Sequence, residues 1–158
     1  MSKSRMCSLS AMRLASCTGS TKGQPTDLLY ISSSKSATGE NPVVHACAVP
    51  LIKGYFPGVG DLFSALVLAH FNPDGESPLP IAVGKALSKT HAIVELTRAY
   101  AQTLEADRTS TDDELDGKYP MRLVRRMRGR ELRLIQGQDI IRGDSGLNRE
   151  MKAWEEFW

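Results

Sequence analysis

Short runs of apolar residues between turn-forming residues open the patterned part of the chain. Residues 28–31 (Leu-Leu-Tyr-Ile) are apolar, aromatic and β-branched, which predicts a buried strand. Residues 43–49 (Val-Val-His-Ala-Cys-Ala-Val) predict a second strand, which Pro50 ends. The link between them is rich in Ser and ends in Asn-Pro, so it predicts a turn or loop. If this link is a hairpin-like connection, the two strands are antiparallel.

Two helical patterns follow the predicted strands. Apolar residues recur at helical spacing in the first pattern: Leu62, Ala65, Leu66 and Ala69. We expect this helix to end near His70 or Phe71, because residues 72–78 (Asn-Pro-Asp-Gly-Glu-Ser-Pro) break any regular element. Residues 79–104 predict a longer amphipathic helix. Four charged residues are expected on its more polar sides: Lys85, Lys89, Glu95 and Arg98.

The last third of the chain has weaker patterns. Residues 106–118 are acidic, rich in Thr and without periodicity, which predicts a mobile loop. Residues 131–136 (Glu-Leu-Arg-Leu-Ile-Gln) alternate apolar and polar side chains, which predicts a half-exposed edge strand. Residues 139–143 predict a short turn, and residues 151–158 predict a terminal amphipathic turn of helix.

A glycine turn precedes the first helical pattern, in the sequence Phe56-Pro-Gly-Val-Gly-Asp61. Two glycines one residue apart allow backbone to approach a ligand closely, and the helix that follows directs its unpaired N–H groups and positive dipole end into the turn. The turn is therefore a candidate anion site. Asp61 could cap the helix, or could act as a base toward a hydroxyl near a bound phosphate. A glycine turn with an ordinary cap is the alternative interpretation.

Composition is that of one soluble globular domain. The chain has 158 residues, with 41% hydrophobic and 24% charged residues, so composition excludes neither an enzyme nor a binding module. Three cysteines without a Cys-x-x-Cys pair argue against a disulfide framework or zinc ribbon and indicate a reducing, cytoplasmic compartment. The three histidines lack the spacing of zinc ligands. No apolar run approaches the roughly 20 residues that span a membrane, so we expect no membrane partner.

Two charged segments suggest other functions. Residues 1–22 carry Ser, Lys and Arg without acids, which is superficially like a transit peptide, although the segment lacks a sustained helical stripe and a solvated start is favoured. Residues 122–130 carry five arginines, which invites a nucleic-acid hypothesis. Because only Tyr119 lies nearby for base stacking and the net charge is only +2, a solvated basic loop beside an edge strand is favoured, with no nucleic-acid partner.

The order of these segments resembles the C-terminal half of a pyridoxal kinase of the ribokinase superfamily. Four pieces carry the resemblance: residues 49–56, the turn and helix start at 58–65, the helical residues 86–96, and residues 131–136 leading into Asp139-Ile140. It implies an α/β fold, the C-terminal part of a ribokinase-like αβα sandwich, with a few strands packed against two main helices. We expect residues 1–143 to form this partial domain and residues 144–158 to form a C-terminal tail.

The resemblance also implies an activity, which is transfer of the γ-phosphate of ATP to the 5′-hydroxyl of pyridoxal, pyridoxine or pyridoxamine. This reaction forms pyridoxal 5′-phosphate in vitamin B6 salvage, with Mg²⁺ and often a monovalent cation such as K⁺, in full-length enzymes that are homodimers. The backbone N–H groups of Gly58, Val59 and Gly60 would hold the transferring phosphoryl group, and Asp61 would accept the proton of the hydroxyl. Other expected ATP contacts are Ile52, Phe56, Val94 and Ser10.

The chain departs from the family pattern in two ways. Val59 stands where the superfamily commonly has Thr or Ala, so a side-chain hydrogen bond to phosphate is lost while the amide remains. Nothing corresponds to the N-terminal half, so we expect little activity from this chain alone, and marginal stability or self-association. Two alternatives stay open, another kinase of the superfamily acting on hydroxymethylpyrimidine or a sugar, and a non-catalytic basic interaction module. The predicted strand at 131–136 favours pyridoxal.

Overall fold

A computed structural model describes residues 26–32, 43–74, 78–104, 113–143 and 149–154. The chain divides into two compact units, each of which is discontinuous in sequence. One, here called the sheet unit, comprises Met1–Leu51, Val67–Lys85 and Asn148–Trp158; the other, here called the turn unit, comprises Ile52–Leu66 and Ala86–Leu147. The two long helices each contribute one part to each unit. The predicted boundary at residue 143 stays a prediction.

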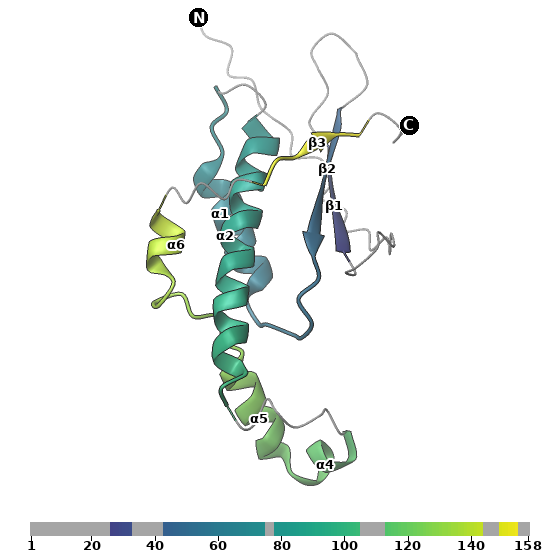
Figure 1. Ribbon diagram of the computed structural model, residues 1–158, viewed down its shortest axis with the longest axis vertical. Coiled ribbons are helices and arrows are strands. Elements are labelled where there is room, and N and C mark those ends of the chain that lie inside the picture. Colours follow the sequence, from purple (N-terminus) through teal and green to yellow (C-terminus); the bar gives the residue numbers. More distant parts are fainter. Residues whose placement is uncertain (1–25, 33–42, 75–77, 105–112, 144–148, 155–158) are drawn as a thin grey trace, which may run out of the picture. The chain divides into compact units, whose positions relative to one another are not determined.

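The sheet unit contains a three-stranded antiparallel sheet with the order β1-β2-β3 (Figure 1). Strand β1 (Thr26–Ser32) pairs with β2 (Val44–Pro50) along their full lengths, from Thr26 opposite Pro50 to Ser32 opposite Val44. Both predicted strands and their antiparallel pairing are confirmed. Pro50 is the last residue of β2, as expected for a residue that cannot donate to the next rung of the ladder.

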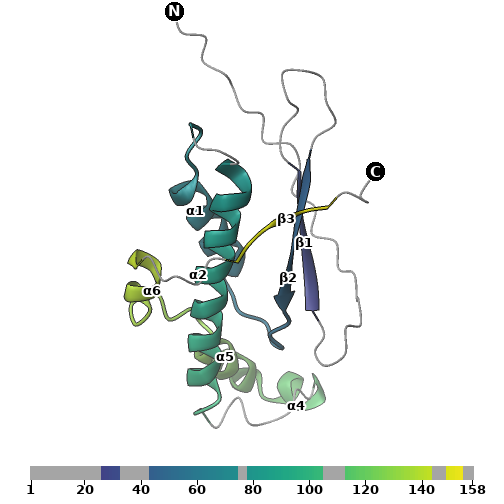
Figure 2. The same cartoon turned by 45° about the horizontal axis from the view of Figure 1, so that its top comes forward.

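The third strand lies where the sequence predicted a turn of helix. Strand β3 (Lys152–Ala153) pairs antiparallel with β2 through two residues, and Figure 2 shows it crossing that strand. The Trp154 N–H donates to the carbonyl of Val44 at 2.8 Å. The prediction of helix over 151–158 is therefore wrong for the described residues, and residues 155–158 lie outside them. Pairing with β2 provides hydrogen-bond partners for the backbone N–H and C=O groups of this segment. A helix of two or three residues is too short to form such bonds internally.

The two long helices agree closely with prediction. Helix α1 spans Val59–His70, and α2 spans Pro78–Ala101 with prolines tolerated in its first turn. The face of α2 that is buried carries mainly small and β-branched residues: Ala82, Val83, Ala86, Ile93, Val94 and Thr97. Lys89 does not lie on a polar side as predicted. It is buried, and its Nζ atom donates a hydrogen bond to the carbonyl of Ile141 at 2.7 Å, which offsets the loss of water around the ammonium group.

Three short helices replace predicted irregular structure. The mobile loop predicted for 106–118 is wrong where the structure describes it, because Asp113–Lys118 forms α4; residues 106–112 lie outside the described residues. The basic run is not a loop, because Pro120–Gly129 forms α5 with proline at its start. The turn predicted for 139–143 is largely α6, Gln138–Arg142. Tertiary contacts, which periodicity does not report, stabilise all three short elements.

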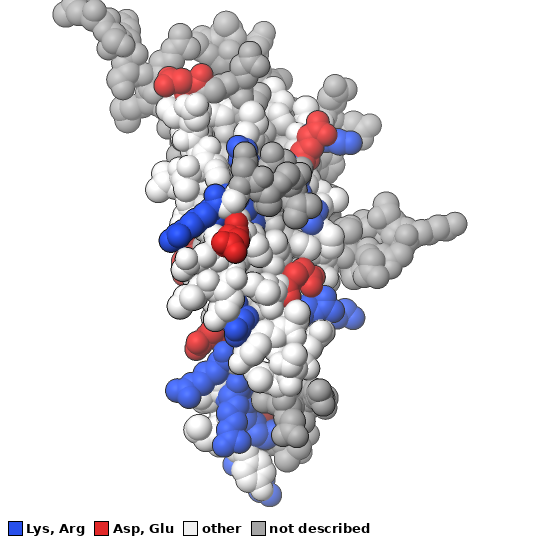
Figure 3. Space-filling view, turned by 60° about the vertical axis from the view of Figure 1, so that its left-hand side comes forward, with Lys and Arg blue, Asp and Glu red and all other residues white. Residues whose placement is uncertain are grey.

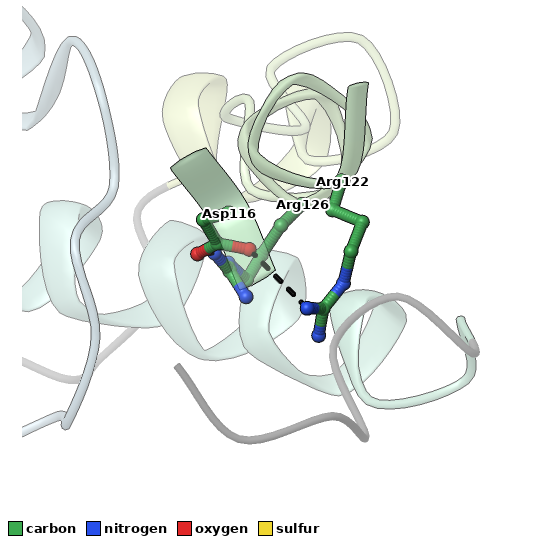
Figure 4. A network of polar contacts seen from close by, with 3 residues as sticks. All are labelled: Asp116, Arg122 and Arg126. Atoms are coloured by element: carbon green, nitrogen blue, oxygen red, sulfur yellow. Dashed lines mark hydrogen bonds and ion pairs between the residues drawn. The ribbon is translucent and has the colours of Figure 1, made fainter. Parts of the chain in front are cut away.

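One buried ion pair joins α4 to α5. The Arg126 side chain is only 5% exposed and donates from its Nη2 atom to Oδ2 of Asp116, while Arg122 Nη1 lies 3.8 Å from Oδ1 of the same carboxylate (Figure 4). Because α5 directs these arginines inward, it exposes apolar side chains instead: Met121, Leu123 and Val124. Lys and Arg side chains still gather over the part of the surface near α5 (Figure 3).

The segment 131–136 is not an edge strand, so this prediction is wrong. The backbone of this segment forms hydrogen bonds with α2 and within the segment's own turn. The Arg133 N–H donates to Thr97 Oγ1 on α2 at 3.2 Å, and the Gly137 N–H donates to the Arg133 carbonyl at 2.9 Å. A Cβ atom on Gly137 would lie 2.2 Å from Cδ1 of Ile93. Close packing of this glycine on α2 therefore bends the chain, and it leaves Ile135 78% exposed.

Candidate functional site

The glycine turn in the turn unit has the geometry of a helix start. Gly58 has a φ of +84°, a left-handed conformation that residues with a Cβ rarely adopt. Its carbonyl accepts the first helical hydrogen bond, from the Leu62 N–H at 3.0 Å. Gly58 thus occupies the cap position, and α1 begins at the next residue.

The first turn of α1 presents backbone donors to open space. The N–H groups of Val59, Gly60 and Asp61 have no acceptor within the helix, because an α-helix leaves its first N–H groups without one. Gly58 and Gly60 are exposed, and a Cβ placed on Gly60 would meet no heavy atom within 4 Å. An anion can therefore approach these amides along the positive end of the helix dipole.

Asp61 lies in this first turn with an exposed side chain. Because Gly58 holds the cap position, Asp61 is three residues too far along the chain to be the cap. Its carboxylate makes no hydrogen bond or ion pair with any residue that the structure describes. Nearby, Ser64 donates from its hydroxyl to the carbonyl of Gly60 at 2.9 Å, which holds the first turn. The geometry leaves the Asp61 carboxylate available to an outside hydroxyl.

The loop before the turn lies against two residues that follow α5, Arg130 and Leu132, and neither was predicted there. Gly54 has a φ of +128°, and a Cβ on it would lie 3.2 Å from the Phe56 ring and 3.3 Å from Nη1 of Arg130. A Cβ on Gly58 would lie 3.7 Å from Cδ1 of Leu132. The chain just after α5 therefore lines the same loop. No periodic signal marks these two residues, because their position depends on how α5 packs.

Three of the four other residues predicted to contact ATP lie within the described part of the chain. Ile52 and Phe56 are half-buried in the loop before the turn, and Val94 on α2 is buried in the same unit. Ser10 lies outside the described residues. The role of each in binding ATP stays a prediction.

The described residues do not form a metal cage. Within the described ranges, no group of three or more His, Cys, Asp or Glu side chains is placed to hold a metal ion. Mg²⁺ commonly binds through one or two carboxylates together with substrate phosphates, so a protein cage is not required for it to accompany a nucleotide. None of the helices in the described part of the chain combines the length and apolarity needed to cross a bilayer.

Cys47 on β2 has the properties of a packing residue. Burial raises the pKa of its thiol, and the Arg149 guanidinium acts weakly in the opposite direction. A raised pKa keeps the sulfur protonated and poorly nucleophilic. This agrees with the sequence interpretation of Cys47 as a small packed residue rather than a nucleophile.

Comparison with known proteins gives one related sequence and several related structures. No family model matches the chain. The Saccharomyces cerevisiae protein named "Putative pyridoxal kinase BUD16" is 32% identical over 121 residues, which cover 72% of this chain and 33% of that protein. The pyridoxal kinase of Leishmania donovani in complex with ADP and pyridoxine has a TM-score of 0.55 at 19% identity, covering 85% of this chain and 36% of that one. The Trypanosoma brucei pyridoxal kinase has a TM-score of 0.51 at 17% identity, covering 82% and 34%.

These matches confirm the predicted fold class, an α/β fold of the ribokinase-like kinases. The sequence match is more specific, and it confirms the resemblance stated above: the chain is similar in sequence to one protein named a putative pyridoxal kinase, and in fold to solved pyridoxal kinases. It spans about a third of the length of the relatives that it matches.

Proposed function

We propose that this chain supplies the phosphate-binding turn and the general base of a kinase that phosphorylates the 5′-hydroxyl of a vitamin B6 vitamer with ATP. The observation that carries the proposal is the exposed first turn of α1, which follows a left-handed Gly58 and contains the exposed Asp61. Solved relatives in complex with ADP and with pyridoxine or pyridoxamine support this substrate class. A cytoplasmic location and a homodimer belong to the same proposal.

The proposed chemistry uses backbone and carboxylate groups of one turn. The amides of Gly58, Val59 and Gly60, together with that of Asp61, would bind the transferring phosphoryl oxygens, where charge accumulates in the transition state. The Asp61 carboxylate would take the proton from the 5′-hydroxyl as its oxygen attacks phosphorus, and ADP would leave. Ile52 and Phe56 would cover the adenine. Mg²⁺ would neutralise phosphate charge when bound with ATP, and the residues here assign it no further role.

The proposal is tested by pyridoxal phosphorylation with the full chain alone and after mixing with a separately made N-terminal half of a related pyridoxal kinase. We expect activity chiefly in the mixture. Asp61→Asn in that mixture should lower kcat about 100-fold or more, the usual scale of general-base catalysis. ATP affinity, measured by calorimetry, should change little.

Asp74→Asn is the matched control, because Asp74 is also exposed but lies after α1, outside the turn. It should leave kcat unchanged. Equal activity of the Asp61→Asn and unmodified mixtures would remove Asp61 from the mechanism. Preference of the mixture for hydroxymethylpyrimidine or ribose over pyridoxal would contradict the substrate class and favour the alternative kinases of the superfamily.

A further inference from the structure

The sheet unit contains a pocket that shares no residue with the glycine turn. Its volume is about 340 Å³, at the lower end of the range of small-molecule sites. Strand β2 contributes His45 to its lining, α2 contributes Ile81 and Lys85, and the segment before β3 contributes Arg149, Glu150 and Met151. Three elements that are far apart in sequence thus meet around one cavity.

Close backbone contacts hold the walls of this pocket. A Cβ on Gly84 would lie 2.2 Å from the carbonyl oxygen of Arg149, so only glycine lets the segment before β3 come this close to α2. On the other side, Ala153 pairs with His45 in the sheet. Figure 2 shows this segment passing from α2 to β2. The pocket is therefore a built feature rather than a gap between mobile loops.

The lining has an excess of positive charge. Lys85 is half-buried and makes no ion pair with any residue that the structure describes. Arg149 lies close enough to Cys47 for its charge to lower the pKa of that thiol, which places a second cation at the same wall. Glu150 is the one acid among the lining residues that the structure describes, and it is exposed. Among the lining residues, two cations therefore stand beside one exposed carboxylate.

Apolar groups line the rest of the cavity. Met151 is buried and Ile81 is 52% exposed, so a ligand could cover the Ile81 side chain and remove apolar surface from water. We propose that this pocket binds a small organic anion, with its carboxylate or phosphate toward Lys85 and Arg149 and its apolar body against Ile81 and Met151. The proposal does not rest on the kinase function.

His45 adds a pH dependence to the proposed site. Its Nδ1 atom is buried without a hydrogen-bond partner among the described residues. Burial lowers the pKa of this histidine from the ordinary 6.5, and the nearby backbone of Val43 acts in the opposite direction. A bound anion favours the imidazolium form, so affinity should increase as pH falls into the range where this imidazole gains its proton. Lys85, Arg149 and Glu150 are the charged groups that face the same cavity.

The test uses phenyl phosphate as a probe, titrated into the 158-residue chain and followed by calorimetry and by amide chemical shifts. We expect amide chemical-shift changes at Ala46, Gly84 and Met151. Inorganic phosphate, which lacks the apolar body, and phenol, which lacks the anionic group, should both bind more weakly than phenyl phosphate. Lys85→Met keeps the aliphatic stem but removes the charge, and it should weaken the binding of phenyl phosphate at least fivefold. Lys85→Arg keeps the charge and should retain most of the affinity. His45→Gln should remove the gain in affinity at low pH.

Lys152→Met is the matched control, because Lys152 is exposed on the neighbouring β3 but does not line the pocket. It should bind phenyl phosphate as the unmodified chain does. Shifts confined to Val59, Gly60 and Asp61 would show that the probe binds the glycine turn and would overturn the proposal. Unchanged affinity in a folded Lys85→Met chain, or an equal loss in Lys152→Met, would also overturn it.

Discussion

Single residues of the glycine turn decide where α1 begins. Gly58 and Gly60 are both glycines of the same turn, yet they have different backbone conformations and different structural roles. Gly58 is left-handed, whereas Gly60 is helical and faces open space. The sequence predicted the turn and its helix correctly, but it could not separate the roles of the two glycines or of Asp61, because a cap and a base require the same carboxylate near a helix start.

Substituting each glycine by alanine should distinguish these two structural roles by their effect on stability. Gly58→Ala should lower the free energy of unfolding by about 1–2 kcal/mol, since alanine is strained in a left-handed conformation. Gly60→Ala should be neutral or stabilise by up to about 1 kcal/mol, because alanine is a better helix former and its methyl group meets no neighbour. Urea unfolding of the two full-length variants measures this. Equal destabilisation by both substitutions would contradict the assignment of Gly58 as the cap.

At the scale of elements, long periodic segments were predicted well and short ones were not. Helices α1 and α2 and strands β1 and β2 follow the sequence pattern. The alternation at 131–136 was misleading because Arg133 bonds to Thr97 and Gly137 packs on Ile93, two contacts made with a distant helix. Likewise, the burial of Arg126 on α5 depends on its partner Asp116, which the arginine-rich run itself does not reveal.

The Asp116–Arg126 pair should be a large local contribution to stability. Arg126→Met should lower the free energy of unfolding by about 3–5 kcal/mol, because it leaves the Asp116 carboxylate with only the more distant Arg122. Arg125→Met is the matched control, because Arg125 is exposed on the same helix, and it should change stability by about 0.5 kcal/mol or less.

A double variant isolates the pair itself. Because apolar replacement of both partners removes the buried charge, Arg126→Met with Asp116→Leu should recover much of the stability lost in Arg126→Met alone. Chemical unfolding of the four chains of this cycle measures the coupling. Additive losses would show that the contact contributes nothing beyond its separate side chains.

At the scale of the whole molecule, the chain exposes several large apolar side chains. Leu68 on α1 is 77% exposed and Ile135 is 78% exposed, and Met121 on α5 is 58% exposed. Contiguous apolar patches mark contacts with another protein surface, whereas single exposed apolar side chains are common. The observation fits the expectation of self-association, which stays a prediction.

Sedimentation of the purified chain over a range of concentrations tests this expectation. We expect reversible self-association that Leu68→Ser combined with Ile135→Ser weakens at least tenfold, because each substitution replaces exposed apolar surface with a polar group. Ala99→Ser, at an exposed position of α2, should have no effect. A chain that stays monomeric at all concentrations would contradict the prediction.

By itself, the sequence determined the elements whose apolar periodicity is long enough to outweigh local alternatives, and the glycine turn that carries the resemblance to pyridoxal kinases. Tertiary structure alone decided the pairing of β3 with β2, the burial of Lys89 and Arg126, and the approach of Arg130 to Gly54 and of Leu132 to Gly58. The physical reason is that short segments and buried charges are stabilised by partners distant in sequence, and a local pattern contains no information about those partners.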